Sequence, residues 1–308
     1  MGVDYSLFNN RISGSIEYYQ SSTKDLLLNR SIVSVSGYTS TYFNVGETQN
    51  RGFELSVNTR NIDKGDLKWS TDFNFSTNKD KVVELYAGKQ DAVELNAFIG
   101  KSLFVYYDYN KIGIWQLSDA VEMAKFNANG AGYKAGDIRV EDLNNDYKID
   151  SNNDRKVIGN RFPKITGGIT NTFNYKNWEF SFFFYARTGF TIEGGAADMQ
   201  GRYASRNIDY WTPTNTTNAY PIADYGNGGQ PIYYSSMNYL DGTFVKLRNV
   251  SLGYTVPART LQKFHMANLK IYAQVLNPYL YKKNDFIDPD IGSSITSRSL
   301  VLGLNASF

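Results

Sequence analysis

The chain has 308 residues, a formal net charge of +2 and no cysteine. The lack of cysteine excludes disulfide scaffolds, metal thiolates and thiol nucleophiles, and a nearly neutral charge without a run of Lys and Arg argues against nucleic acid as a partner. Aromatic residues make up 15% of the chain, a load that suits β structure, stacking on sugars or a membrane girdle rather than a helical bundle.

Membrane insertion, if it occurs, must use strands. No stretch approaches the roughly 18 consecutive apolar residues of a transmembrane helix. The N-terminus runs from Met1 directly into a strand pattern, without the charged and apolar regions of an export signal. We therefore expect either a cytoplasmic protein or a sequence that begins partway through a longer chain.

Alternation of apolar and polar side chains predicts nine strands. The first two, 2–8 and 11–20, form a hairpin around Asn9-Asn10, a pair that tolerates the positive φ of a tight turn. A separate strand-like piece covers 103–109 within a long polar connection. The other seven predicted strands are 51–60, 67–77, 163–174, 178–187, 243–254, 268–277 and 298–308.

Strand 243–254 breaks strict alternation, because its apolar face passes from Leu247 to Val250 with a slip of one residue. A β-bulge near Arg248-Asn249 would supply this slip.

The last strand has one apolar face and one small, mostly polar face. Its apolar residues are Leu300, Leu302, Leu304, Ala306 and Phe308. A soluble edge strand could show this pattern, but soluble domains seldom end on an aromatic residue in their last strand. Apolar-out and polar-in alternation is what a transmembrane barrel needs.

The connections between strands alternate in length. They are short after 8, 60, 174 and 254, and long after 20, 77, 187 and 277. A membrane barrel predicts this asymmetry, with short periplasmic turns and long extracellular loops. We therefore expect an all-β fold, an antiparallel up-and-down transmembrane β-barrel of about nine strands that is part of a larger barrel, because an odd number cannot close a barrel with both termini inside.

Several motifs in a fixed order carry a family resemblance. They are Gly136-Asp137-Ile138-Arg139-Val140-Glu141-Asp142-Leu143-Asn144-Asn145-Asp146, Ile149-Asp150, Ile158-Gly159-Asn160-Arg161-Phe162-Pro163, Tyr210-Trp211-Thr212-Pro213 with Asn215 and Tyr220-Pro221, the strand motif 244–254, Asp288-Pro289-Asp290 and the terminal Phe308. Over essentially the whole chain they resemble the C-terminal barrel region of SusC/RagA-type TonB-linked outer-membrane transporters of Bacteroidetes.

The resemblance implies a barrel of about 22 strands, the plugged class of outer-membrane transporter. It further implies an N-terminal plug and a signal peptide outside residues 1–308, coupling to the TonB complex, a SusD-like lipoprotein lid, and uptake of oligosaccharides or peptides. Residues 1–308 would then supply barrel wall and outer loops in contact with outer-membrane lipid.

The segment 142–150 has the spacing of an EF-hand-like calcium loop. Position 6 of that motif, normally Gly, is Tyr147, and position 12 is Asn153, with Asp154 one place late. The alternative is an Asx-rich turn cluster on a surface loop. The candidate ligands are Asp142, Asn144, Asp146, the backbone carbonyl of Lys148, Asp150 and Asp154.

Aromatic residues of the predicted outer loops are candidates for stacking on sugar rings. The substrate-contact candidates are Trp115, Tyr210 and Trp211, with Tyr106 and Tyr107 as further aromatics. Such residues as often pack loops together. Trp69, Trp178 and Tyr18 are better interpreted as a membrane girdle, and Glu17, Glu54, Asp72, Glu179 and Arg187 as charges of the barrel lumen.

Nothing in the sequence singles out a catalytic site. The lone His265 excludes a Ser/His/Asp set, and no phosphate-binding Gly loop is present. We therefore expect a non-enzymatic part of a nutrient importer in the bacterial outer membrane. Two alternatives stay open: a soluble β-sandwich that binds glycans or acts as an adhesin, and a passive porin-like barrel.

Overall fold

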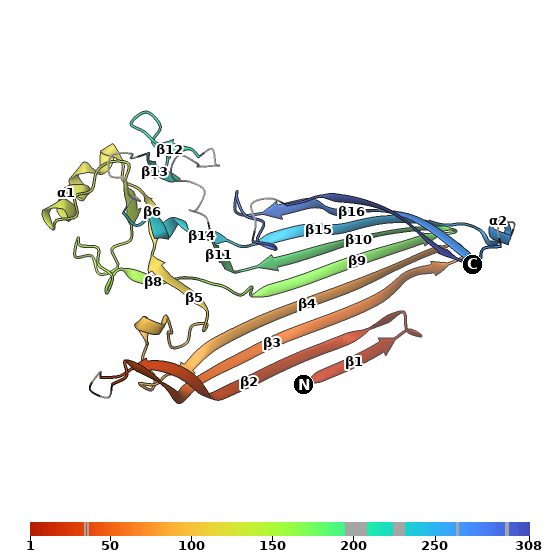
Figure 1. Ribbon diagram of the computed structural model, residues 1–308, viewed down its shortest axis with the longest axis horizontal. Helices are drawn as coiled ribbons and strands as arrows, with labels where there is room; N and C mark the ends of the chain where they lie inside the picture. Colours follow the sequence, from red (N-terminus) through yellow and green to blue (C-terminus); the bar gives the residue numbers. More distant parts are fainter. Residues whose placement is uncertain (34, 36, 195–207, 224–231, 263–264, 293–295) are drawn as a thin grey trace. The chain divides into compact units, whose positions relative to one another are not determined.

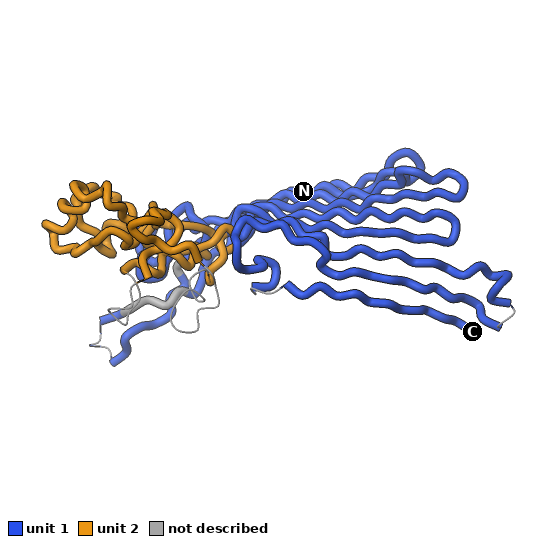
Figure 2. Tube along the Cα trace, turned by 90° about the horizontal axis from the view of Figure 1, so that it is seen from above, with its two compact units in different colours: residues 1–103, 162–190, 242–308 blue, residues 104–161, 191–241 orange. Residues whose placement is uncertain are grey.

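The computed structural model describes residues 1–33, 35, 37–194, 208–223, 232–262, 265–292 and 296–308. The chain divides into two compact units (Figure 2). Unit 1 comprises Met1–Leu103, Phe162–Phe190 and Gly242–Phe308, and unit 2 comprises Phe104–Arg161 and Thr191–Asp241.

Unit 1 contains a nine-stranded antiparallel sheet in which each strand pairs with the preceding and following sheet strand along the chain (Figure 1). All nine predicted strands are present, and the up-and-down order is confirmed. The strands are β1 (Gly2–Leu7), β2 (Ile12–Ser31), β3 (Ser40–Lys64), β4 (Leu67–Glu84), β9 (Ile165–Tyr175), β10 (Trp178–Thr188), β15 (Phe244–Thr255), β16 (Asn268–Lys282) and β17 (Ser299–Ser307).

Strands β2, β3, β4 and β16 extend beyond their predicted bounds. β3 has 25 residues, because its polar stretch continues the hydrogen-bonded ladder: Asn50 pairs with Asp80 of β4, and Gln49 with Lys81. The predicted long connection after residue 20 is therefore wrong and shrinks to 32–39. The alternation of apolar and polar side chains does not indicate these extensions, because their side chains are polar and the β-ladder needs only backbone hydrogen bonds.

The remaining connections follow the predicted alternation. The β1–β2 turn confirms the role of Asn9 and Asn10, which have φ values of 57° and 63°. The other short connections are 65–66, 176–177 and 256–267, the last with helix α2 (Ala258–Leu261). The long connections 85–164, 189–243 and 283–298 leave the opposite ends of their strands, as the antiparallel order requires.

The predicted β-bulge is confirmed on both sides of β15. Its register with β10 shifts between Phe183 and Phe184, and its register with β16 shifts between Leu247 and Asn249. On β16 the irregularity coincides with Asn277, which has a φ of 52°, and with Pro278, which has no N–H to donate to the ladder.

The apolar face of the sheet is exposed. Leu300, Leu302 and Leu304 of β17 have exposed fractions of 67%, 73% and 70%. The other sheets in the described residues have two strands each, so the part of the chain that the structure describes has no second large sheet with which these rows could form a sandwich core. Within the same described ranges, no helix combines the length and apolar character needed to cross a membrane.

Aromatic rings lie over glycines on the opposite, polar face. A Cβ added at Gly303 of β17 would collide with the ring of Tyr272 on β16, and one at Gly52 of β3 would collide with Tyr19 on β2. Each glycine therefore provides the space that its cross-strand ring occupies, which fixes the register of the pair.

Unit 2 is built from short elements around its own apolar clusters. The predicted piece 103–109 appears here, as β5, rather than in the large sheet. Its sheets pair β5 (Val105–Tyr109) with β8 (Arg155–Asn160), β6 (Lys111–Ile114) with β7 (Ile138–Val140), β11 (Thr191–Glu193) with β14 (Tyr239–Asp241) and β12 (Tyr210–Trp211) with β13 (Tyr220–Ile222). The helix α1 covers Ala120–Ala128, and 3-10 turns cover Leu117–Asp119 and Tyr234–Met237, with a third, Val93–Leu95, in unit 1.

Candidate functional site

The polar face of the sheet is a surface of hydroxyl, amide and charged groups. Opposite β4 and β9 positions pair Ser70 with Thr172 and Asp72 with Thr170. The register also brings the predicted lumen charges to this one face, which carries Glu17, Glu54, Asp72, Glu179 and Arg187. Such a surface offers hydrogen bonds to a polar solute.

The polar groups that lie on the apolar face bond to one another. Asn171 is 8% exposed, and its Oδ1 accepts hydrogen bonds from Trp69 Nε1 at 2.9 Å and from Thr71 Oγ1 at 2.7 Å. The Trp69 ring stacks on Phe173. Trp69 and Trp178 lie on this face near the short turns 65–66 and 176–177. This position supports their interpretation as girdle residues.

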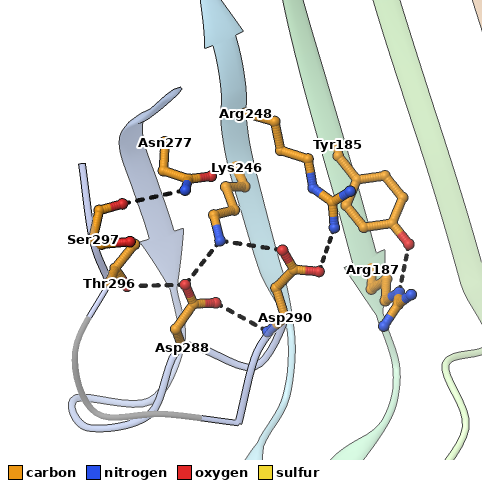
Figure 3. Close-up of polar contacts among 9 residues, drawn as sticks. All are labelled: Tyr185, Arg187, Lys246, Arg248, Asn277, Asp288, Asp290, Thr296 and Ser297. Carbon is orange, nitrogen blue, oxygen red and sulfur yellow. Dashed lines mark hydrogen bonds and ion pairs between the residues drawn. The ribbon is translucent and has the colours of Figure 1, made fainter. Parts of the chain in front are cut away.

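A cationic and aromatic group marks the polar face near the long connections (Figure 3). The guanidinium of Arg248 lies 4.2 Å from the ring centroid of Tyr185, and that of Arg187 lies 5.3 Å from it. Arg187 also donates a hydrogen bond from Nε to the Tyr185 hydroxyl at 2.6 Å. Stacking orders both guanidiniums, which can donate hydrogen bonds to carboxylate, carbonyl and hydroxyl groups.

Trp115 and Trp211 are buried within unit 2, each with 2% exposure. Trp115 stacks on Tyr133, and the guanidinium of Arg139 lies 4.3 Å from its ring centroid. Trp211 donates from Nε1 to Gln116 Oε1 at 2.8 Å. Their burial supports the loop-packing alternative over direct contact of these rings with a substrate.

Gly136, the first residue of the longest motif, makes room for Trp211. It has a φ of 95°, and a Cβ there would collide with the Trp211 ring and with Ile222. Two separate motifs thus meet in one packing contact.

Tyr210 differs from its neighbour in being 45% exposed. Tyr106 and Tyr107, in contrast, pack against other side chains: the ring of Tyr106 lies 5.1 Å from that of Tyr239, and Tyr107 lies under Arg155. Of the three substrate-contact candidates, Trp115, Tyr210 and Trp211, Tyr210 is thus the one that is exposed to solvent, and its role stays a prediction.

The segment 142–154 folds as a cluster of side chain to backbone hydrogen bonds. Asp142 accepts the N–H groups of Asn145 and Tyr147 at 2.8 and 2.9 Å. Asp154, which is fully buried, accepts those of Leu143 and Asp150 at 2.9 and 2.8 Å. The remaining candidates follow the same pattern: Asn144 and Asp146 hydrogen bond to each other, and Asp146 accepts the N–H of Lys148.

Tyr147 has a φ of 60°, so it adopts the left-handed conformation that calcium loops normally give to Gly. Its ring packs edge-on against Phe126 and under Lys125, contacts that offset the backbone strain. Among the described residues, however, no three acidic or histidine side chains converge as a metal site would require. Calcium binding stays a prediction.

Burial and hydrogen bonds set the ionisation of other groups in unit 2. Burial, with the hydrogen bond between their hydroxyls at 2.9 Å, raises the pKa of Tyr133, and burial raises the pKa of Tyr233. Hydrogen bonds from Lys156 and Asn110 lower the pKa of Glu141. The pair of Glu141 and Lys156 connects two short strands of unit 2, since Glu141 follows β7 and Lys156 lies in β8.

A buried ion cluster of unit 1 was missed as a site. It joins Lys246 and Arg248 to Asp288 and Asp290. Both pairs lie in motifs that the sequence indicates only as carriers of the family resemblance. The available signal was the pairing of two cations in one motif with two carboxylates in another.

Comparison with known sequences places these features among related proteins. No protein-family model matches the chain. It is 31% identical to TonB-dependent receptor P3 of Formosa agariphila, covering 100% of this chain and 33% of that protein. It is 25% identical to TonB-dependent receptor SusC of Bacteroides thetaiotaomicron, covering 100% of this chain and 31% of that protein.

Solved structures show the same fold. The RagAB peptide importer in its open-open state matches with a TM-score of 0.77 and 21% identity, over 100% of this chain and 34% of that one. Its closed-closed state matches with a TM-score of 0.74 and 20% identity, over 100% and 35%. The sequence matches and this shared fold together confirm the resemblance that the motifs indicated. The chain spans about a third of the length of the relatives it matches.

Proposed function

Because the chain is related over its whole length to the SusC/RagA family of TonB-dependent receptors, we propose that it is the C-terminal part of a nutrient importer in the bacterial outer membrane. Its nine-stranded sheet supplies barrel wall, and unit 2 supplies outer loops. The plug, the signal peptide and the TonB-contacting segment belong to other parts of the full-length protein. The chain itself performs no chemical reaction.

The observation that carries this proposal is the two-faced sheet. Rows of exposed Leu on one face and hydroxyl, amide and charged groups on the other fit lipid on one side and water on the other. A soluble sandwich would bury the apolar rows against a second sheet. The long connections at one end of the strands fit extracellular loops.

The solute is an oligosaccharide or a peptide, and the partner is a SusD-like lipoprotein that closes over the outer loops. The solved match, a peptide importer assembled as RagAB, supports the peptide class. The oligosaccharide class follows from the family resemblance, which includes the relative SusC. Energy enters through TonB, which rearranges the plug after the solute is captured. The exposed ring of Tyr210 is the loop aromatic that we assign to solute contact.

The test uses the full-length protein in its own bacterium. We expect it in the outer-membrane fraction, extractable only with detergent, and with a heat-dependent shift in gel migration. Deleting its gene should abolish uptake of one glycan or peptide fraction, and so should deleting TonB. Uptake that survives loss of TonB would indicate the passive porin, and a monomer soluble without detergent would indicate the sandwich.

A further inference from the structure

The segment after β16 belongs to unit 1, the unit that contains the large sheet. Residues 242–308 belong to unit 1, whereas the longest parts of the connections that follow β4 and β10 form unit 2. We use the name inner strap for residues 283–292 together with Thr296 and Ser297. Its contacts with the polar face of the sheet are shown in Figure 3.

Lys246 is the centre of these contacts. Its Nζ donates to Asp288 Oδ2 at 2.9 Å and to Asp290 Oδ2 at 3.1 Å. The side chains of Lys246, Asp288 and Asp290 are exposed by only 2%, 0% and 8%. A lysine is almost never this deeply buried without a partner, and here two carboxylates of the strap provide the partners.

The strap contacts the sheet at further points around this lysine. Arg248, two residues further along β15, pairs with Asp290. Thr296 donates from Oγ1 to Asp288 Oδ2 at 2.9 Å. Asn277 of β16 donates from Nδ2 to the carbonyl of Ser297 at 3.2 Å. Asn277 and Arg248 lie where the β15–β16 ladder is irregular, so the strap docks where the ladder itself is interrupted.

The strap is also braced internally. The carbonyl of Asp288 accepts the N–H of Gly292 at 2.9 Å, and its carboxylate accepts the N–H of Asp290 at 3.0 Å. Asn284, which is 6% exposed, accepts the N–H groups of Phe286 and Ile287. The backbone is thus shaped to deliver both carboxylates to the same ammonium group.

We propose that the inner strap is a fixed part of the barrel's inner wall, with Lys246 as the latch that holds it on the polar face. The proposal rests on the proposed function, which makes this face the interior of the barrel. A solute passing this sector of the wall then meets the strap and the exposed part of Arg248, which Asp290 holds beside Tyr185, while Lys246 is covered.

Lys270 provides a matched control for the role of Lys246. Lys270 lies on the same face and pairs at 2.9 Å with Glu179, but its side chain is 32% exposed and its partner belongs to a strand. Removing Lys270 takes away a partly hydrated pair within the sheet. Removing Lys246 instead leaves the covered carboxylate of Asp288 without a cation and leaves Asp290 with Arg248 alone, which favours release of the strap into water.

The test measures the position of the strap in the full-length protein, purified in detergent. One spin label is placed at Ile291, which is 54% exposed on the strap, and one at Leu252, which is 45% exposed on β15. We expect one narrow distance distribution in the otherwise unchanged protein and with Lys270→Ala. Lys246→Ala should broaden it several-fold. If that variant does not assemble, Asp288→Asn, which keeps the side-chain shape, should broaden it.

A broad distribution in the unchanged protein, or a narrow one in Lys246→Ala or Asp288→Asn, would overturn the latch. Uptake is measured separately on the unchanged protein. A narrow distance distribution without uptake would contradict the proposed function and agree with a fixed strap. Uptake with a broad distribution would agree with the proposed function and contradict the fixed strap.

Discussion

Lys246 Nζ lies 2.9 Å from Asp288 Oδ2, and the two side chains come from β15 and from a connection 42 residues further along the chain. Neither side chain is more than 2% exposed. Buried pairs of this kind contribute little net stability compared with apolar residues, but losing one partner is costly. The pair therefore specifies where the strap lies more than how stable the sheet is.

Replacing Lys246 by Ala should destabilise unit 1 by about 3–5 kcal/mol, because the buried carboxylate of Asp288 loses its cation and Asp290 keeps only Arg248. Replacing Lys270, whose pair with Glu179 is partly exposed, should cost less than about 1 kcal/mol. Urea titration of the full-length protein in phospholipid bilayers, with gel migration as the readout of unfolding, measures the change in free energy for both variants. Equal effects of the two substitutions would contradict the special role of Lys246.

The strap should remain in place in weakly acidic solution. Burial alone would raise the pKa of Asp288, but hydrogen bonds from Lys246, the N–H of Asp290 and Thr296 outweigh it and lower the pKa from its ordinary value of 3.8. A lowered folded-state pKa means that the stabilisation is present above that ordinary value and is lost as the pH falls through the lower folded value.

The mobility of a spin label at Ile291 checks this. The mobility should be the same at about pH 5 as at neutral pH and should rise only below the ordinary aspartate pKa of 3.8. The charged groups at this site are Lys246, which pairs with both Asp288 and Asp290, and Arg248, which pairs with Asp290. A rise in the mobility of the label at about pH 5 would refute the assigned direction of the pKa shift.

Gly303→Ala should weaken the pairing of β16 with β17. The added methyl group would overlap the Tyr272 ring, and overpacking of this kind costs about 1–3 kcal/mol. Gly167→Ala in β9 is the matched control, because its Cβ would lie 3.4 Å from the nearest atom, the carbonyl oxygen of Asn74. The temperature at which gel migration changes should fall for Gly303→Ala and hardly change for Gly167→Ala.

The sequence predicts the sheet well because alternation reports directly which face is wet. The slip from Leu247 to Val250 even locates the bulge, since one extra residue is the only way to keep both on one face. The alternation disappears where both faces are polar, as around Asn50. There the backbone ladder continues without leaving a signal in the side chains.

Burial inside the loops could not be predicted in the same way. Trp211 and Tyr210 are adjacent and both aromatic, yet one is 2% exposed and the other 45%. That difference depends on Gly136 and Ile222, which approach Trp211 from distant segments. The pairing of Lys246 with Asp288 is equally non-local, so neither motif alone indicates it.

Calcium, if it binds the segment 142–154, should bind weakly. The carboxylates of Asp142 and Asp154 already accept backbone N–H groups, and hydrogen bonds from the N–H groups of Asn153 and Asn152 lower the pKa of Asp150 and favour its ionised form. We expect half-saturation at about 1 mM calcium, in the range of extracellular modules. Thermal melting with calcium and with a chelator, repeated on Asp146→Asn, measures it, and identical melting curves would remove the site.

Trp211→Ala should disrupt unit 2, whereas Tyr210→Ala should leave it folded. Trp211 is buried beside Gly136 and hydrogen bonded to Gln116, so its truncation should cost about 3–5 kcal/mol. Limited proteolysis of the full-length protein in outer-membrane vesicles measures this as faster cleavage of the loops in Trp211→Ala alone. Because the Tyr210 ring is exposed, Tyr210→Ala should reduce uptake of the imported solute with no change in proteolysis. Normal uptake by this variant would remove Tyr210 from the solute contact, and rapid cleavage of it would show that its ring is structural, as that of Trp211 is.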